Sequence, residues 1–320
     1  MLPKATNAVE SQNIVLRSVE RRKIMEIRVL RYFLAVAREQ SISGAAQALH
    51  LSQPTLSRQL MDMEQKFGKQ LFIRGNKRIT LTEDGMLFRR RAEEIIDLVD
   101  KTEAEITATD DSISGDIYIG AGETEVMRHL AKIAKDIQND YPDIHYHIFS
   151  GNAEIVMERL DKGLIDFGLL LDANDASKYN YVELPSTDIF GILMKKDSPF
   201  ADREAISFND LKKMPLIVSA QPHYHAPEKQ VKKILDSLNI VATYNLIYNA
   251  SLLVEEGLGY ALCLDRLIKI TDESPLCFVP LESQYEIKPY VAWKKNQVFS
   301  KASDLFLKRL CEAFGNNQKA

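Results

Sequence analysis

The sequence predicts an α/β protein that carries a small, mainly helical domain near its N-terminal end. Between residues 25 and 110, apolar residues recur at helical spacing, and one short pair of strands interrupts them. From residue 115 onward, short apolar runs alternate with amphipathic helices, which is typical of an α/β fold with a mostly parallel sheet. Residues 25–91 carry 12 Lys or Arg against 6 Asp or Glu, although the whole chain has a net charge of −4. We therefore expect the basic N-terminal domain, and not the acidic remainder, to meet a polyanion.

The first 24 residues differ from the rest of the chain. They are polar and show no sustained apolar period, so we expect 1–24 to be a disordered extension or a mis-assigned start that precedes a native Met25. They also lack the apolar run of a signal peptide, and the chain has no run of about 18 uncharged apolar residues. A cytoplasmic protein without membrane contact is therefore predicted. The three cysteines form no short-spaced pair and are interpreted as reduced thiols.

Three helices are predicted to follow Met25. The first spans 26–38 with a buried stripe of four residues at helical spacing: Ile27, Leu30, Leu34 and Ala37. Ser43 is expected to cap the second helix, Ser52 to cap the third, and Gly68 to end the third. Apolar residues at spacings of 4, 3 and 4 predict the buried face of the third helix: Leu56, Leu60, Met63 and Phe67. Two short helices that meet at a tight turn predict a helix-turn-helix.

A strand at 71–74, a basic turn at 75–78 and a strand at 79–82 predict a β-wing next to this motif. A long helix from about 82 to 110 comes next. Its apolar residues alternate at spacings of 4 and 3, the period of a coiled-coil seam: Phe88, Ala92, Ile95, Val99, Thr102 and Ile106. We expect this seam to pair with a second copy of the chain; packing against the chain's own C-terminal domain is the alternative.

The third helix has the chemistry of a DNA reader at its N-terminal end, the part that a helix-turn-helix places against base edges. There Gln53 suits adenine and Arg58 suits guanine, whereas Thr55 and Ser57 suit either a base or a phosphate. Four basic residues are predicted to bind phosphates: Arg31, Arg74, Lys77 and Arg78. A solvated side chain is the alternative for each residue alone. Their convergence in the one clearly basic segment favours binding of double-stranded DNA.

The run from Leu30 to Gly85 contains the series AA…L…SQP..SRQ….E…G..LF.R….LT..G and resembles the winged helix-turn-helix of LysR-type transcriptional regulators. The resemblance places Gln53, Pro54, Ser57 and Arg58 in the recognition helix and Arg74 in the wing. It implies a DNA-binding domain at 25–82, a dimerising linker helix at 83–111 and an effector-binding domain at 112–320. The partners that it implies are promoter DNA and further copies of the chain, as a dimer and then a tetramer, with RNA polymerase as a candidate.

The same resemblance implies that the C-terminal domain folds like a type 2 periplasmic binding protein. Lobe one would comprise 115–187 plus 284–315, and lobe two would comprise 188–283. A small-molecule effector, which the sequence does not identify, would lie between the lobes, and no cofactor is expected. Effector binding would then modulate DNA binding.

Ligands of such α/β domains bind at the turns where a strand ends and a helix begins, which are called hand-overs below. Four hand-overs carry the candidate effector-binding residues: Glu123 and Thr124; Ser150, Gly151 and Asn152; Ser219 and Gln221; Asn249 and Ser251. Plain helix capping is the alternative for each. Glu123 differs from the small hydroxyl residues of many LysR-type regulators, because a carboxylate disfavours an anionic effector and favours an amine or a neutral polar ligand. Alternatively, Glu123 stabilises the N-terminus of the helix that follows it.

Two other classes of function are disfavoured. A solute-binding protein would need a signal peptide and no basic domain. An enzyme would need catalytic residues, and the sequence has no phosphate-binding glycine loop, nucleophile elbow or metal-ligand series. The pairs His145/His147 and His223/His225 have no neighbouring ligands that would complete a metal site, so none is predicted.

Overall fold

The structure is a computed structural model that describes residues 25–75, 78–107, 113–171, 178–220, 237–282 and 286–315. The chain divides into two compact units, Met1–Thr102 and Glu103–Ala320. The proposed N-terminal extension at 1–24 lies outside the described residues. Among the described residues, no helix is both long enough and apolar enough to span a lipid bilayer.

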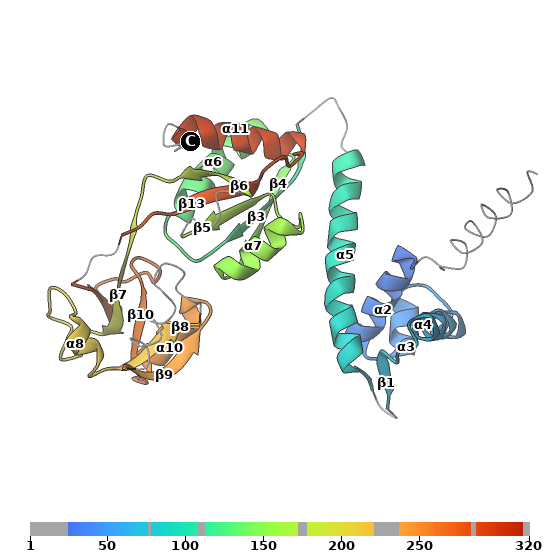
Figure 1. The fold of residues 1–320 in the computed structure, drawn as a ribbon, viewed down its shortest axis with the longest axis horizontal. Coiled ribbons are helices and arrows are strands. Elements are labelled where there is room, and N and C mark those ends of the chain that lie inside the picture. Colours follow the sequence, from blue (N-terminus) through green and yellow to red (C-terminus); the bar gives the residue numbers. More distant parts are fainter. Residues whose placement is uncertain are drawn as a thin grey trace, which may run out of the picture. The chain divides into compact units, whose positions relative to one another are not determined.

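The N-terminal unit is a winged helix-turn-helix, as predicted. Its elements are α2 (Ile27–Glu39), α3 (Ile42–Ala48), α4 (Gln53–Phe67), β1 (Phe72–Arg74), β2 (Ile79–Leu81) and α5 (Glu83–Thr107) (Figure 1). The hydroxyl of Ser52 caps α4, and Gly68 ends it at φ +61°, which confirms both predictions. Ser41, not Ser43, caps α3, because this helix begins before Ser43 and the Ser41 hydroxyl accepts from the N–H of Gly44 at 3.2 Å.

Phe33 lies at the centre of the core of this unit. It is fully buried, and its ring centroid lies 4.9 Å from that of Phe72 and 4.7 Å from that of Phe88. The buried face of α2 is rotated by about one residue from the predicted stripe. Ile27, which was expected in the core, is therefore 42% exposed. Phe67, also expected inside, is 44% exposed and touches Phe88 at the edge of the core.

The long helix α5 contributes to this core, which corrects the predicted seam. Phe88, Ala92 and Ile96 pack with α2, α3 and α4 of the same chain. Ala92 is fully buried and Phe88 is half-buried in the core of their own unit, so these two positions do not form an open seam. Among the described residues of α5, five large apolar side chains stay exposed. Leu87, Ile95, Leu98 and Ile106 lie on a face next to the buried one, and Met86 lies on another face.

Gly85 lies where α5 crosses the start of the wing. A Cβ atom at Gly85 would lie 2.1 Å from the carbonyl oxygen of Leu71. The Thr82 hydroxyl fixes the same crossing, because it accepts from the N–H of Gly85 at 2.9 Å and donates to the carbonyl of Gln70 at 2.8 Å. Glycine is required here by the close approach of two backbones.

We expect Gly85→Ala to lower the free energy of unfolding of the N-terminal unit by about 1–3 kcal/mol or more, because the wing and α5 must separate to admit the methyl group. Gly44→Ala is the matched control. Gly44 is also helical, and an added Cβ would lie 3.5 Å from its nearest neighbour. Alanine there is expected to raise the free energy of unfolding of the N-terminal unit by about 0.5–1 kcal/mol. Denaturant unfolding of both variants checks this; equal midpoints would contradict the expected steric conflict.

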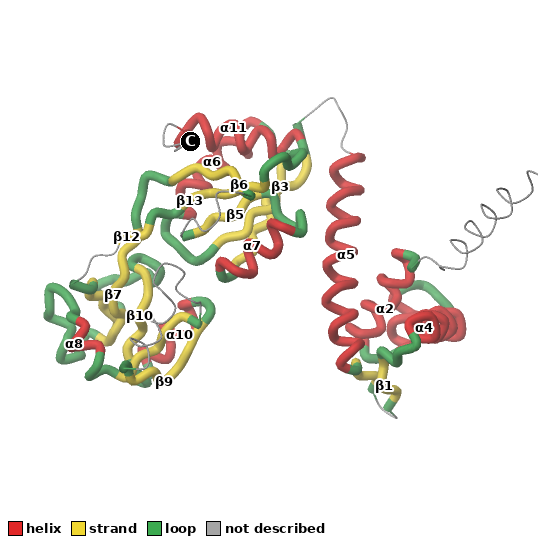
Figure 2. The backbone as a smooth tube through the Cα atoms, viewed as in Figure 1, coloured by secondary structure: helices red, strands yellow, loops and turns green. Residues whose placement is uncertain are grey.

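The C-terminal unit contains two α/β halves, each with its own sheet (Figures 1 and 2). The first half has the strand order β4-β3-β5-β13-β6. Its strands are β3 (Gly115–Ala121), β4 (Ile144–Ser150), β5 (Phe167–Leu170), β6 (Tyr179–Glu183) and β13 (Tyr290–Lys294). Helices α6 (Met127–Asp140) and α11 (Lys301–Phe314) cover one face, and α7 (Ala153–Asp161) covers the other.

The second half has the strand order β11-β7-β10-β8-β9, and β12 pairs with β7. Its strands are β7 (Asp188–Lys195), β8 (Pro215–Ser219), β9 (Asn239–Tyr244), β10 (Tyr260–Leu264), β11 (Leu276–Pro280) and β12 (Glu286–Ile287). Helix α8 (Phe208–Leu211) packs on one face and α10 (Ile247–Glu255) on the other.

Both sheets are mixed, which corrects the prediction of a mostly parallel sheet. Strands β3, β4 and β5 run parallel, as do β8, β9 and β10. However, β13 pairs antiparallel with β5 and β6, and β7 pairs antiparallel with β10, β11 and β12. The start of the helix predicted at Asn249 and Ser251 also differs, because β9 ends at Tyr244 and α10 begins at Ile247.

Candidate functional site

The N-terminal end of α4 presents the predicted DNA-reading residues at the surface. Gln53, Pro54, Thr55 and Arg58 are exposed, and Ser57 is half-buried. The hydroxyl of Thr55 lies 2.7 Å from that of Ser52, whose oxygen also accepts from the N–H of Thr55 at 3.3 Å. Thr55 therefore takes part in capping α4, whereas Gln53 and Arg58 are exposed to solvent.

The basic residues around this face differ in whether an acidic partner occupies them. Among the described residues, Arg58 has no ion-pair partner. Arg31 bonds to Asp100 of α5 at 2.6 Å, and Arg74 lies 3.5 Å from Glu64. Phosphate binding by Arg31 would have to break its ion pair first. Arg78 is exposed in the wing, and Lys77 lies outside the described residues.

Glu64 fixes the wing against α4, a role that the sequence reading did not assign. One carboxylate oxygen accepts from the N–H of Leu71 at 2.7 Å and from that of Phe72 at 3.0 Å. The side chain is 14% exposed, and its other oxygen faces Arg74. The signal available in the sequence was an acidic residue that directly follows the buried Met63 and precedes the helix end at Gly68. Glu64 thus sets where the wing arginine lies relative to α4.

The predicted hand-overs of the first half lie side by side at the carboxyl ends of parallel strands. Ala121 pairs with Ser150, and the N–H of Gly151 donates to the carbonyl of Ala121 at 3.0 Å. Asn152 caps α7 by accepting from the N–H of Ile155 at 2.9 Å, so its side chain performs the capping role that was the alternative to effector binding. Ser150 is exposed and Gly151 is buried.

The hand-overs of the second half also meet, but one of them is shifted from its predicted position. Ser219 pairs with Tyr244 at the ends of β8 and β9. Asn249 and Ser251 were expected at the start of a helix, yet α10 already begins at Ile247. Ser251 is buried and donates its hydroxyl proton to the carbonyl of Tyr248 at 2.7 Å. Gln221 lies outside the described residues.

Glu123 and Thr124 connect the two halves. The carboxylate of Glu123 accepts from the backbone N–H of Ile247 at 2.5 Å, and the hydroxyl of Thr124 donates to the carboxylate of Asp188 in β7. The hydrogen bond of Glu123 thus goes to α10 of the second half. Asp188 was not predicted, because no local pattern marks an acidic residue at the start of a buried strand as functional.

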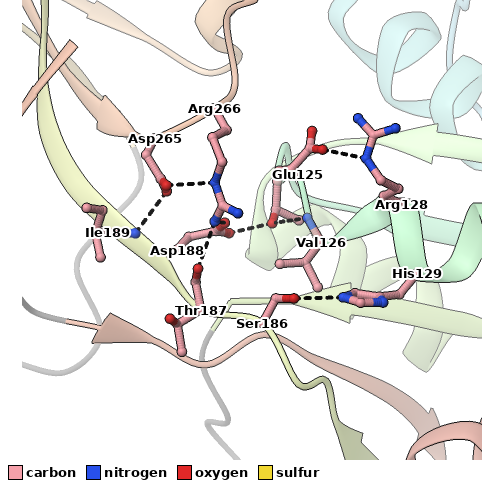
Figure 3. A network of polar contacts seen from close by, with 11 residues as sticks. Glu125, Val126, Arg128, His129, Ser186, Thr187, Asp188, Ile189, Asp265 and Arg266 are labelled. Atoms are coloured by element: carbon pink, nitrogen blue, oxygen red, sulfur yellow. Dashed lines mark hydrogen bonds and ion pairs between the residues drawn. The ribbon is translucent and has the colours of Figure 1, made fainter.

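Asp188 is the buried acid of a polar network at the start of β7 (Figure 3). Its other oxygen accepts from Arg266 at 3.2 Å, and Arg266 also donates to the carbonyl of Thr187 at 2.8 Å and to Asp265 at 2.7 Å. Asp265 in turn accepts from the N–H of Ile189 at 3.0 Å. Burial raises the pKa of Asp188 above its ordinary value, although the Thr124 hydrogen bond and the Arg266 charge act in the opposite direction.

This raised pKa predicts a pH-dependent contribution to stability. Because the folded state holds the Asp188 proton more tightly than the unfolded state, the contribution is fully present below the ordinary carboxyl pKa and is lost as pH rises through the raised value. Asp188→Asn stays neutral, so its melting temperature is expected to rise relative to that of the parent protein as pH rises from about 4. Differential scanning calorimetry at a series of pH values measures this gain.

Glu125→Gln is the matched control for this pH dependence. In the parent protein the pKa of Glu125 is lowered, first by the hydrogen bond from Arg128. The stabilising effect of Glu125 is therefore present above the ordinary carboxyl pKa and is lost on acidification. The melting temperature of Glu125→Gln is therefore expected to fall behind the parent protein as pH rises. Parallel pH profiles for both variants would contradict the assignment to Asp188.

The histidine pair of β4 does not form a metal site with its neighbours. His147 stacks on Tyr118 and lies 3.1 Å from Asp116, and His145 is exposed. In the described parts of the chain, no three His, Cys, Asp or Glu side chains come together in a way that would hold a metal ion. His223 and His225 lie outside those parts.

Comparisons with known proteins agree with this architecture. Residues 27–86 match the model of the bacterial regulatory helix-turn-helix protein, lysR family, and residues 110–315 match the model of the LysR substrate binding domain. The HTH-type transcriptional regulator BsdA of Bacillus subtilis (strain 168) is 27% identical over 290 residues, which cover 88% of this chain and 99% of BsdA. CysL of the same organism is 30% identical over 183 residues, covering 57% of this chain and 61% of CysL.

A solved structure has the same fold over nearly the whole chain. The crystal structure of full-length CbnR complexed with target DNA superposes with a TM-score of 0.68 at 18% identity, covering 90% of this chain and 100% of CbnR. Two family models that together span the helix-turn-helix and both α/β halves determine the assignment: the chain belongs to the LysR family and is a DNA-binding transcriptional regulator with an effector-binding domain.

Proposed function

We propose that the chain reads promoter DNA in the cytoplasm with the N-terminal end of α4. Gln53, Thr55, Ser57 and Arg58 would contact base edges and nearby phosphates in the major groove, and Pro54 would start the helix. The observation that carries this proposal is the exposed guanidinium of Arg58, which has no acidic partner among the described residues. Wing residues Arg74, Lys77 and Arg78 would bind flanking phosphates, with Arg31 available after its ion pair with Asp100 opens.

We further propose that a second copy of the chain pairs with the exposed apolar face of α5. Leu87, Ile95, Leu98 and Ile106 fit a series of steps of three or four residues, which is the spacing of a coiled-coil seam. Arg91 and Thr102 occupy the intermediate steps. Such pairing would hold two recognition helices at two half-sites of the operator.

The effector is proposed to bind between the two halves of the C-terminal unit, with lobe one at 115–187 plus 288–315 and lobe two at 188–283 plus β12. The predicted boundary at 284 is moved because β12 (Glu286–Ile287) pairs with β7 of the second half. Support comes from the polar turns at the carboxyl ends of β3, β4 and β9, which precede α6, α7 and α10, because helix N-termini favour polar ligands. Effector binding would change how the halves are held and so change the contacts of the paired N-terminal units with DNA.

Selection of bound duplexes from a random DNA pool tests the proposed function directly. The full-length protein is expected to enrich a sequence with two related half-sites, and nuclease footprinting is expected to show protection at both. Enrichment without any sequence preference would contradict direct readout by α4. In parallel, small molecules that raise the melting temperature of the full-length protein identify effector candidates, because a ligand that binds only the folded state stabilises it.

A further inference from the structure

Helix α10 lacks a side-chain cap of its own. Its N-cap residue is Leu246, which makes no side-chain capping hydrogen bond, and no acidic residue lies in its first turn. Five other described helices are capped by a polar side chain at the N-cap position: Ser41, Ser52, Asn152, Ser207 and Ser300. The first N–H groups of a helix need acceptors and carry a partial positive charge, so the start of α10 needs a partner from elsewhere.

Glu123 supplies that partner from the other half of the C-terminal unit. It lies in the turn between β3 and α6, and its Oε2 accepts from the N–H of Ile247 at 2.5 Å. The side chain is half-buried. The negative charge of Glu123 also contributes to the raised pKa of Tyr244, after burial and Cys263, which is consistent with its position at the end of β9. A carboxylate of the chain itself therefore occupies the first amide of α10.

The residue next to Glu123 makes a second contact between the halves. Thr124 is 7% exposed and donates to the fully buried carboxylate of Asp188, where β7 begins. The same hydroxyl oxygen accepts from the N–H of Val126 at 3.0 Å, which fixes the turn. Thr124 thus holds the turn in the position from which Glu123 reaches α10.

We propose that Glu123 is an internal latch: its carboxylate takes the place of an anionic ligand at the N-terminus of α10 and holds the two halves together in the absence of an effector. This latch deepens the proposed function and depends on one part of it, namely that effectors bind between the halves. Its chemical consequence is that a free carboxylate competes with Glu123 for the amide of Ile247. A carboxylate therefore binds there once Glu123 is removed, and not while Glu123 is present.

Hydrogen exchange at the first turn of α10 tests the latch in the full-length protein. In Glu123→Ala, a peptide that contains Ile247 is expected to exchange about 10- to 100-fold faster, the ratio that corresponds to loss of a hydrogen bond to a charged acceptor. Glu123→Gln keeps an oxygen acceptor without the charge, so its exchange rate is expected to lie between those of the parent protein and Glu123→Ala. Glu125→Ala is the matched control, because it removes a neighbouring carboxylate that pairs with Arg128. Unchanged exchange in Glu123→Ala overturns the latch.

Rescue by acetate tests whether the latch replaces an anionic ligand. Acetate is expected to restore slow exchange at α10 in Glu123→Ala, whereas chloride at equal ionic strength is not. Acetate is expected to have no effect on the parent protein. If acetate fails to slow exchange in Glu123→Ala, this end of α10 does not accept a free carboxylate and that part of the proposal is wrong. Neither measurement uses DNA, so failure of the proposed DNA-reading face leaves both results interpretable.

Discussion

Replacing Arg58 with alanine is expected to weaken binding to the selected operator by about 10- to 100-fold, the factor that corresponds to about 1–3 kcal/mol for one bidentate base contact. The physical reason is that Arg58 lies exposed near the N-terminal end of α4 without an acidic partner among the described residues, so no ion pair has to break before it meets a base. Fluorescence anisotropy with the operator and with a duplex altered at the Arg58 position measures both affinity and discrimination.

Lys66→Ala is the matched control for this prediction. It removes one positive charge from the last turn of the same helix, where Lys66 is exposed and far along α4 from Gln53. Its effect on operator affinity is expected to be small and similar for all sequences, as for a general electrostatic contribution. If Arg58→Ala and Lys66→Ala weaken operator and non-operator DNA equally, Arg58 does not read a base.

Replacing Leu98 with glutamate is expected to separate the proposed dimer and to lower operator affinity by about 100-fold or more. Two coupled N-terminal units bind two half-sites with an effective concentration that a single unit lacks, and this coupling is worth about 10²- to 10⁴-fold. Leu98 is 42% exposed at the middle of the apolar face of α5, so a charge there would meet its own copy across a paired seam. Sedimentation velocity gives the assembly state, and anisotropy gives the affinity.

Ala104→Glu places the same charge on a different face of the same helix. Ala104 is exposed, and its position along α5 lies away from the line of Leu98 and Ile106. This control is expected to keep both the assembly and the affinity of the parent protein. A Leu98→Glu protein that sediments like the parent would show that the exposed face of α5 is not the pairing surface.

Local patterns in the sequence predicted much of the N-terminal unit correctly. Ser52 and Gly68 mark the ends of α4 because capping depends on neighbours within one turn. The period of α4 gave three of its four predicted core residues, Leu56, Leu60 and Met63. Phe67 was placed wrongly, because helical spacing defines a face but does not say how far the neighbouring elements extend along it.

The apolar seam of α5 shows even more clearly that spacing along the chain does not decide which residues are buried. Its apolar period predicted a long helix, and the helix is present. Periodicity alone, however, did not assign Phe88 and Ala92 to the core of their own domain and Leu98 to the exposed face. That division depends on where α2 and α4 pack against α5, which is a property of the tertiary structure.

The sequence by itself determined the winged helix-turn-helix, the alternation of strands and helices and the family, because these follow from spacing, capping and motif order along the chain. Only the tertiary structure decided that Glu123 caps a helix 124 residues later, that Glu64 ties the wing to α4, and that Asp188 is a buried acid. Such contacts join groups that are distant in sequence or leave no periodic signal. Hydrogen bonds depend on position in space, and folding alone brings the carboxylate of Glu123 to the amide of Ile247.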